Sequence, residues 1–390
     1  MHILIFCEQH PHTIGGAQMS VVLQAKFLRR AGHTVTLVSP ALRTGPLTDP
    51  NYIDLPSWPI PTVAEYTWMW PRKAHLLSIA TALASKAPVD VVHVQSDFWG
   101  AALGYRFASQ HNLPVVHTFH NRLDVGVDGT FPFPGLLYAV LGRWQRWSLG
   151  ERRGGMSRTA YDYFAGYARE AHAIIAPSRH FARILTERGV TARGGESPSV
   201  IPTGVDDDVI ATVKKSQPDR SKPARVVWVG RFSREKRPVE FCEALSLVTP
   251  EPHGVLVGSG ALRADAERVA PLGTEFTGPL AYPDALREIA AADVLVQSSF
   301  GFETQGMTVT EALALGTAVV VVDPDIASEL AEGQVTVAKD RSPQGLAAAI
   351  ELAIVAARGA HGQSRDERSA LLQSTLTKQA ISLYESVIAR

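Results

Sequence analysis

The sequence is poor in cysteine and balanced in charge, and both features narrow the class of protein. Only two of the 390 residues are cysteines, Cys7 and Cys242, which lie far apart without metal-ligand spacing. This usage argues against a disulfide framework and favours a reducing compartment, the cytoplasm. The 38 basic residues equal the 38 acidic ones, so the overall charge gives no reason to expect a nucleic-acid partner.

Long apolar runs are also missing. No segment reaches the roughly 18 apolar residues that a membrane span needs. The first residues, MHILIFCEQH, lack the basic region of a signal peptide. We therefore expect a protein that neither spans a membrane nor is secreted by the signal-peptide route.

Short apolar runs alternate instead with longer helical patterns, and 45% of the residues are hydrophobic, enough for two cores. Strands of a parallel sheet are predicted at residues 2–6, 34–39, 89–94, 115–119, 173–176 and 199–201, with a first helix at 17–31. The alternation restarts at 225–229, 254–257, 275–277, 294–297 and 318–322. This pattern predicts an α/β chain with two doubly wound, Rossmann-like domains that face each other across a cleft.

The domain boundaries follow from this restart. An N-terminal domain is expected over 1–204 and a C-terminal domain over 205–370, with the polar segment 214–223 as a surface linker just inside it. The closing segment 371–390 is helical in pattern over 371–388 and could pack on either domain.

The loops that follow strands carry the residues of interest, because ligands of open α/β sheets bind at the carboxyl ends of the strands. Gly15 and Gly16 precede the first helix, where they either admit a ligand close to the backbone or form a simple tight turn. Arg231 and Lys236 follow the strand at 225–229. These two cations either straddle a diphosphate or are solvated charges.

The stretch GFETQGMTVTEALALGTAVVVVD raises the question of why two acids stand close together. Glu303 is predicted to lie on a loop and Glu311 on a helix over 307–315 that stops at Gly316. The free N–H groups around Gly306, Met307 and Thr308 would face the same space and favour an anion. Carboxylates accept hydrogen bonds from hydroxyls, so the set suits a nucleotide sugar. The alternative is that both acids only contact solvent.

The motifs GRFSREK and SFGFETQGMTVTEALALGTAVVV resemble the donor-binding half of the retaining GT-B glycosyltransferases of family four, the sucrose-synthase and phosphatidylinositol-mannosyltransferase group. The shorter motifs IGGAQ, PVVHTFH, AIIAPS, VIPTGVD, VGSGAL and FTGPL extend this resemblance in matching order along nearly the whole chain. The resemblance implies the GT-B fold. It also implies metal-independent transfer of a hexose, with retention of configuration, from a UDP- or GDP-linked sugar to a hydroxyl acceptor.

Site residues are implied position by position. Arg231 and Lys236 would bind the donor diphosphate, and Gly16 would make room for it. Glu311 would hold the ribose hydroxyls, and Glu303 would contact the transferred sugar.

Backbone N–H groups from Gly306 through Met307 to Thr308 would hold sugar or phosphate oxygens. His120 would hydrogen-bond the sugar near the reacting carbon, although the residues alone favour a satisfied histidine there. No side-chain nucleophile, metal or other cofactor is implied. The segment 323–330 departs from the family's pattern, which bears on the identity of the sugar.

The acceptor is the least defined partner. Between 143 and 193 ten arginines stand against four acids, and the aromatic segment 131–147 lies just upstream. These residues could seat the protein on an anionic membrane beside a lipid acceptor, form a core helix with solvated arginines, or bind a soluble glycan or sugar phosphate. A GT-B-like nucleotide- or sugar-binding protein without transfer activity is the alternative function.

Overall fold

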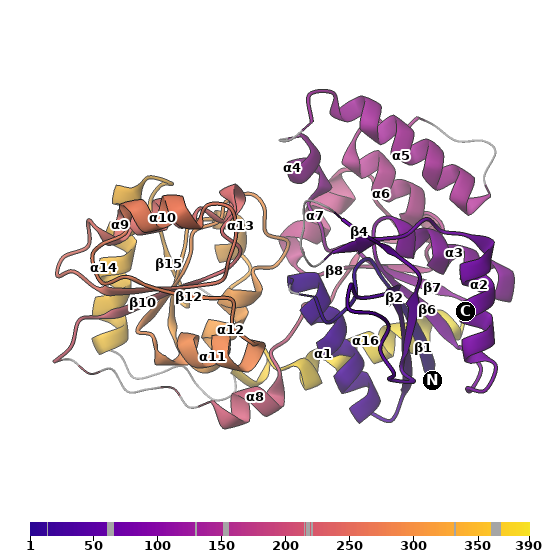
Figure 1. Cartoon of the computed structure of the whole chain (residues 1–390), viewed down its shortest axis with the longest axis horizontal. Coiled ribbons are helices and arrows are strands. Elements are labelled where there is room, and N and C mark those ends of the chain that lie inside the picture. The colour runs from indigo at the N-terminus through magenta and orange to yellow at the C-terminus, as the bar shows by residue number, and fades with distance from the viewer. Residues whose placement is uncertain are drawn as a thin grey trace. The chain divides into compact units, whose positions relative to one another are not determined.

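The computed structural model describes residues 1–13, 15–60, 66–128, 131–150, 156–213, 215, 219, 221–330, 333–359 and 368–390. The chain divides into an N-terminal unit, Met1–Thr203 with Leu376–Arg390, and a C-terminal unit, Gly204–Thr375. Each unit has its own parallel sheet with helices around it (Figure 1). Several positions of the expected linker 214–223 lie outside the described residues.

The sheet of the N-terminal unit has seven parallel strands in the order β3-β2-β1-β6-β7-β8-β9. Their bounds are β1 His2–Cys7, β2 Thr34–Pro40, β3 Tyr52–Leu55, β6 Val91–Gln95, β7 Val115–Thr118, β8 Ala173–Ala176 and β9 Ser199–Val200. All six strands predicted in this half are confirmed. The edge strand β3 was not predicted, because a four-residue run that contains an aspartate is too short to show a period.

Helices cover both faces of this sheet. Their bounds are α1 Gly16–Arg30, α2 Lys73–Leu83, α3 Trp99–His111, α4 Leu123–Asp128, α5 Pro134–Leu149, α6 Ala160–Ala168, α7 Arg179–Glu187 and α16 Gln373–Ile388, beside the short antiparallel pair β4 Trp58–Pro59 and β5 Thr67–Trp68. Alternate residues of β1 point to opposite faces. Ile3 shares a core with Ala380 and Tyr384 of α16, whereas Leu4 belongs to the core on the α3 side. The closing helix therefore packs on the N-terminal unit.

The C-terminal unit repeats this plan with six parallel strands in the order β12-β11-β10-β13-β14-β15. The strands are β10 Arg225–Val229, β11 His253–Val257, β12 Glu275–Gly278, β13 Val294–Gln297, β14 Ala318–Val321 and β15 Thr336–Val337. The helices are α8 Asp207–Thr212, α9 Pro238–Leu245, α10 Arg263–Val269, α11 Tyr282–Ala291, α12 Met307–Leu315, α13 Pro324–Ala327 and α14 Pro343–Gly359. Residues of α9 and α14 pack on one face and residues of α11 and α12 on the other.

The strand order of each sheet reverses once. In the N-terminal unit the reversal lies between β1 and β6, and in the C-terminal unit between β10 and β13. Chain connections leave in opposite directions at such a point and open a crevice beyond the carboxyl ends of the two strands. The loops after β1, β6, β10 and β13 are therefore placed to hold ligands.

Two glycines in the loop after β11, Gly258 and Gly260, pack against the loop after β10. Gly258 has φ +133, and a Cβ atom there would lie 1.9 Å from the carbonyl oxygen of Gly230. Gly260 has φ +152, and a Cβ atom there would lie 2.6 Å from the carbonyl oxygen of Phe232. Backbone hydrogen bonds join the two loops, including one from Phe232 N–H to Ser259 O at 2.9 Å. These glycines form a turn that supports the segment with Arg231.

Substitution of Gly258 by alanine is expected to destabilise the protein. The new methyl group meets a backbone oxygen, and the positive φ is unfavourable for alanine, so we expect a loss of about 2 kcal/mol or more. Thermal unfolding followed by circular dichroism measures it. Gly126→Ala in α4 is the control, because its Cβ meets no atom within 4 Å. Equal melting temperatures for the two variants would contradict this account.

Candidate functional site

Hydrogen bonds through one serine join the loops after β10 and β13, which carry the candidate site residues. The indole Nε1–H of Trp228 donates to Ser298 Oγ at 2.9 Å, and Ser298 Oγ donates to the carbonyl oxygen of Lys236 at 2.7 Å. Lys236 ends a 3₁₀ turn, Arg234–Lys236. Arg231 stands exposed at the start of the same loop. One buried serine thus fixes the spacing between the cationic loop and the acidic loop.

Lys236 and Glu303 are in direct contact. The ammonium group forms an ion pair with Glu303 Oε1, which also accepts a hydrogen bond from Ser299 Oγ at 2.9 Å. The ammonium lies 5.6 Å from the ring centroid of Phe302. The side chains of Lys236 and Glu303 are 24% and 11% exposed, so the pair is shielded from water on most sides. Two residues that are far apart in the sequence therefore form one charged centre.

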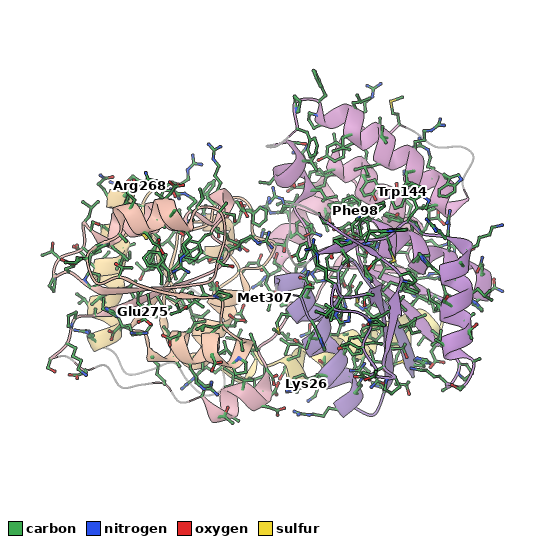
Figure 2. The ribbon with its side chains drawn as sticks, in the orientation of Figure 1. Lys26, Phe98, Trp144, Arg268, Glu275 and Met307 are labelled. Carbon is green, nitrogen blue, oxygen red and sulfur yellow. The ribbon has the colours of Figure 1, made fainter. Side chains whose placement is uncertain are left out.

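Helix α12 begins at this centre with an open N-terminus. Gly306 precedes it in the left-handed conformation (φ 78), and no described side chain caps this end. Met307, labelled in Figure 2, is its first residue. The hydroxyl of Thr308 approaches Gln297 Oε1, at the end of β13, at 3.5 Å. The first N–H groups and the helix dipole favour an anion at this position.

Glu311 lies one turn further along α12 and is buried, with 7% exposure. Burial raises the pKa of its carboxyl group to about 7, although the neighbouring Tyr282 hydroxyl opposes this rise. A solvent-exposed helix residue, the alternative considered above, does not fit this environment. A buried acid whose pKa is raised in this way is typical of a functional site.

The other two candidate residues belong to the N-terminal unit. Gly16 is exposed and is the first residue of α1, which no described side chain caps. His120 follows β7, and its Nε2 atom lies 2.8 Å from Gln95 Oε1 at the end of β6. Burial lowers the pKa of His120 to about 4, so the ring is neutral at pH 7. His117 is a core residue, with Nδ1 2.9 Å from the Tyr105 hydroxyl.

Two acids at the reversal between β1 and β6 were not predicted from the sequence, the half-buried Glu8 and the buried Asp97. Glu8 follows β1, and its Oε2 atom accepts hydrogen bonds from Ser96 Oγ and from the backbone N–H of Phe98. Asp97 follows β6, and its Oδ2 atom accepts one from Asn121 Nδ2. Within the described part of the chain, Glu8 Oε1 and Asp97 Oδ1 have no partner. Burial raises the pKa of Glu8 to about 8 and that of Asp97 to about 7.

A signal for these acids exists in the sequence. Glu8 directly follows a buried strand and Asp97 closely follows another, at the sheet edge where ligands bind.

Phe98, labelled in Figure 2, stacks its ring on Tyr163 at 5.9 Å between centroids and holds the loop after β6 in place.

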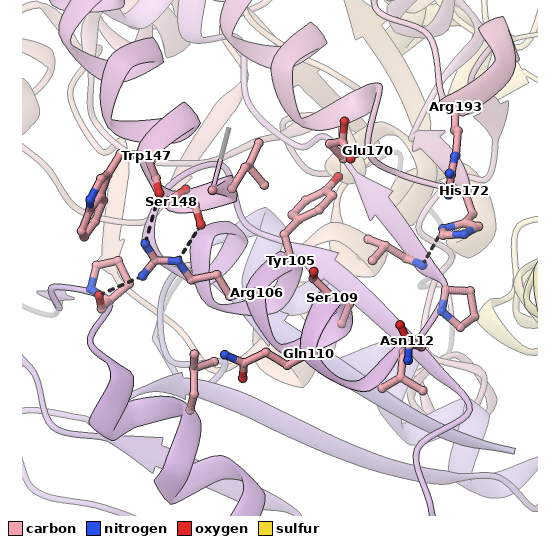
Figure 3. Close-up of a pocket in the computed structure, with 18 of the residues that line it drawn as sticks. Tyr105, Arg106, Ser109, Gln110, Asn112, Trp147, Ser148, Glu170, His172 and Arg193 are labelled. Atoms are coloured by element: carbon pink, nitrogen blue, oxygen red, sulfur yellow. Dashed lines mark hydrogen bonds between the residues drawn. The ribbon is translucent and has the colours of Figure 1, made fainter. Parts of the chain in front are cut away.

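A pocket of about 1090 Å³ lies elsewhere in the N-terminal unit (Figure 3). It opens at the amino ends of β7 and β8, where the N–H of Val115 donates to His172 Nδ1 at 3.1 Å. Arg106 and Trp147 line it, and the guanidinium group of Arg106 donates to Ser148 O at 2.5 Å. None of the candidate residues lines this pocket, which lies at the sheet edge opposite to the one with Gln95 and His120.

Within the described ranges, no group of three or more His, Cys, Asp or Glu side chains is placed to hold a metal ion. No described helix is both long enough and apolar enough to cross a membrane.

Family models match both halves of the chain. The family described as Glycosyltransferase Family 4 matches residues 14–209, and the one described as Glycosyl transferases group 1 matches residues 223–354. Among solved structures, a sucrose-phosphate synthase from Thermosynechococcus elongatus is similar, with a TM-score of 0.67 at 18% identity over 100% of this chain and 99% of the other. The HepE protein of Anabaena in complex with UDP and glucose also gives 0.67 at 18% identity, over 99% of both chains. This likeness confirms the expected fold class.

Curated relatives are closer in sequence than these two structures and match most of this chain. An alpha-monoglucosyldiacylglycerol synthase from Streptococcus pneumoniae is 24% identical over 82% of this chain and 70% of its own length. A GDP-mannose-dependent alpha-(1-6)-phosphatidylinositol dimannoside mannosyltransferase from Mycobacterium tuberculosis is 26% identical over 86% of this chain and 83% of its own length.

The pH dependence of stability tests the environment of Glu311. Its pKa lies above the usual 4.5 in the folded chain, so the folded state binds this proton more tightly and loses stability as the pH rises towards about 7. Between about pH 5 and pH 8 this group should cost the wild type about 1–3 kcal/mol of its free energy of unfolding. We expect Glu311→Gln to lack that loss. Glu243→Gln, at an exposed position of α9, should leave the slope unchanged. Parallel curves for wild type and Glu311→Gln would contradict the assignment.

Proposed function

Because the chain belongs to glycosyltransferase family 4, it is a hexose-transferring enzyme with the GT-B fold, and we propose that its C-terminal unit holds the nucleotide-sugar donor while its N-terminal unit binds the acceptor. The observation that carries this proposal is the contact between Lys236 and Glu303 beside the open N-terminus of α12. It combines a cation and a helix end, which attract phosphate, with an acid, which accepts hydroxyl hydrogens.

The donor's parts fit this order of groups. Lys236 and Arg231 bind the diphosphate, Lys236 as a point charge and Arg231 as a planar fork. The N–H groups of Met307 and Thr308 bind sugar or phosphate oxygens. Glu303 accepts from a hydroxyl of the transferred sugar, and Glu311 accepts from the ribose hydroxyls. The ion pair with Glu303 holds the Lys236 side chain in position before the donor arrives.

The chemical step then depends on charge rather than on a nucleophilic side chain. As the bond from the sugar to the diphosphate lengthens, negative charge grows on the leaving oxygens. Lys236, Arg231 and the dipole of α12 stabilise that charge without moving, which is how electrostatic catalysis lowers a barrier. The departing phosphate accepts the proton of the attacking hydroxyl on the same face of the sugar. Attack on that face retains the anomeric configuration.

The acceptor is a hydroxyl compound at the reversal between β1 and β6. Glu8 Oε1 and Asp97 Oδ1 are buried there without a partner among the described residues, and such oxygens are costly unless a ligand supplies hydrogen bonds. The names of the two curated relatives refer to a diacylglycerol and to a phosphatidylinositol glycolipid. A lipid or lipid-linked acceptor is therefore the form we propose, with a soluble glycan or sugar phosphate as the alternative.

Helix α5 supports a peripheral membrane location on the cytoplasmic side. Leu136, Val140, Arg143 and Trp147 follow one another at helical spacing and are all exposed. A core helix would bury such apolar residues, whereas an interfacial helix places them among lipids with arginine at the headgroups. Of the basic segment 143–193, residues 151–155, with two of its ten arginines, lie outside the described residues.

The donor proposal is tested by thermal stabilisation with UDP, GDP, ADP and their sugar conjugates. A ligand at 100 times its dissociation constant stabilises the folded state by about 2.7 kcal/mol. One class of nucleotide should therefore raise the melting temperature selectively. Lys236→Ala and Glu311→Ala should each weaken that nucleotide by about 10- to 100-fold, because each removes a charged partner.

Lys339→Ala removes an exposed cation of the same unit and should bind as the wild type does. A nucleotide shift that persists in both site variants would place the donor elsewhere. Retention is read separately from the anomeric proton coupling of the product, and an inverted product would exclude the proposed step.

Membrane association is tested by flotation with vesicles that contain phosphatidylglycerol. Replacing Leu136 and Val140 together by aspartate should weaken binding by about tenfold or more, because apolar area is lost and negative charge is added. Leu352 and Val355 on α14 are equally exposed apolar residues, and their aspartate variants are the matched control. Equal flotation of both double variants, or no flotation of the wild type, would contradict the membrane location.

A further inference from the structure

A row of buried polar side chains leads from His120 to the closing helix α16. It begins with the contact between His120 and Gln95 and continues through hydrogen bonds that join, in order, Gln95, Gln24 on α1, Tyr384 on α16, His93 on β6 and Thr118 on β7. The donor–acceptor distance is 2.9 Å from Gln24 to Tyr384, 2.8 Å from Tyr384 to His93 and 2.7 Å from His93 to Thr118. Tyr384 and His93 are both 0% exposed.

With the two amides oriented as the structure has them, donation runs in one direction along this row. An amide donates through nitrogen and accepts through oxygen. Gln95 Nε2 donates to Gln24 Oε1, and Gln24 Nε2 donates to the Tyr384 hydroxyl. The free oxygen of Gln95 must therefore accept, so the proton on His120 lies on Nε2. Each amide of the row has both of its ends assigned.

Tyr384 joins the two amides to His93 and Thr118. Its hydroxyl accepts from Gln24 and so has its own hydrogen left to donate to His93 Nδ1. His93 then carries its proton on Nε2 and donates it to Thr118 Oγ1. Burial lowers the pKa of His93 well below its usual value, which keeps this ring neutral and able to accept.

We propose that Tyr384 is a positioning residue that fixes the tautomer and the orientation of His120 through Gln24 and Gln95. The proposal rests on the function above in one respect, which is that His120 contacts the transferred sugar. With the Nε2 proton donated to Gln95 Oε1, Nδ1 carries the lone pair, so the second ring nitrogen of His120 is a defined acceptor. A residue of the last helix thereby sets the chemistry of a loop that follows β7.

Packing alone does not account for the hydroxyl of Tyr384. Phenylalanine would fill the same core between α1 and the sheet, whereas the hydroxyl satisfies two buried partners at once. Without it, Gln24 Nε2 loses its acceptor, and the amide is free to turn over. Gln95 then loses the partner that fixes its own orientation, and its oxygen is no longer held towards His120.

The test compares Tyr384→Phe with Tyr105→Phe in the full chain. Tyr105 is the matched control, because it is a buried tyrosine whose hydroxyl lies 2.9 Å from Nδ1 of another histidine, His117, but it has no bond to Gln95. Selective ¹⁵N labelling of histidine reports the tautomer of each ring, and the His120→Gln variant assigns the signals. Steady-state kcat and donor KM are measured with the donor found by thermal stabilisation.

We expect Tyr384→Phe to raise the fraction of His120 protonated on Nδ1 by roughly 3- to 10-fold, the range for loss of one hydrogen bond. The kcat should fall by a similar factor at unchanged donor KM, and Gln24→Met should reproduce both effects. Tyr105→Phe should lower the melting temperature but leave the His120 signals as they are. Unchanged His120 signals in Tyr384→Phe, or equal changes in both tyrosine variants, would overturn the proposal.

The role of His120 in the reaction is judged separately. Wild-type kcat in His120→Ala would contradict its contact with the sugar and hence that part of the proposed function. The ¹⁵N signals of Tyr384→Phe decide the linkage in either case, because they report the ring itself and do not depend on turnover.

Discussion

Parallel pairing of strands is the constraint on which both candidate sites depend. All strands of a parallel sheet end at one edge, and the strand order of each sheet reverses once, between β1 and β6 and between β10 and β13. Loops after the reversing strands cannot be covered by a connecting helix. The ionisable residues of those loops are therefore held at the edge where ligands bind, Lys236 and Glu303 in one unit and Glu8 and Asp97 in the other.

The two edges handle charge differently. In the C-terminal unit, a cation and an acid neutralise each other beside an open helix end, so a phosphate can enter without leaving either charge unpaired. In the N-terminal unit, burial raises the pKa values of the Glu8 and Asp97 carboxyl groups and lowers that of His120, which is neutral at pH 7. The first arrangement suits an anionic ligand and the second a hydroxyl compound, which is the division of labour proposed between donor and acceptor.

Both edges are supported by buried polar side chains rather than by the loops themselves. Ser298 sets the spacing of the C-terminal loops, and the row from Gln95 to Tyr384 sets the orientation of His120. A side chain that reacts or binds must be held within a fraction of an ångström, and hydrogen bonds in a low-dielectric core provide that precision. The same bonds couple the closing helix to the N-terminal sheet.

The sequence by itself determined the α/β class, most strands and the two segments that carry the candidate residues, one with Lys236 and one with Glu303 and Glu311. Apolar period and glycine positions are local properties, so they can be read without the fold. Short polar-containing strands such as β3 were missed, because four residues show no period. The sequence also left open which of the two domains α16 packs on and whether Glu311 is solvent-exposed.

Only the tertiary structure decided those points. It placed Tyr384 in the N-terminal core, buried Glu311 and joined Lys236 to Glu303, which are contacts between residues far apart in the chain. Burial and hydrogen bonding depend on which segments become neighbours, and local spacing carries no record of that choice.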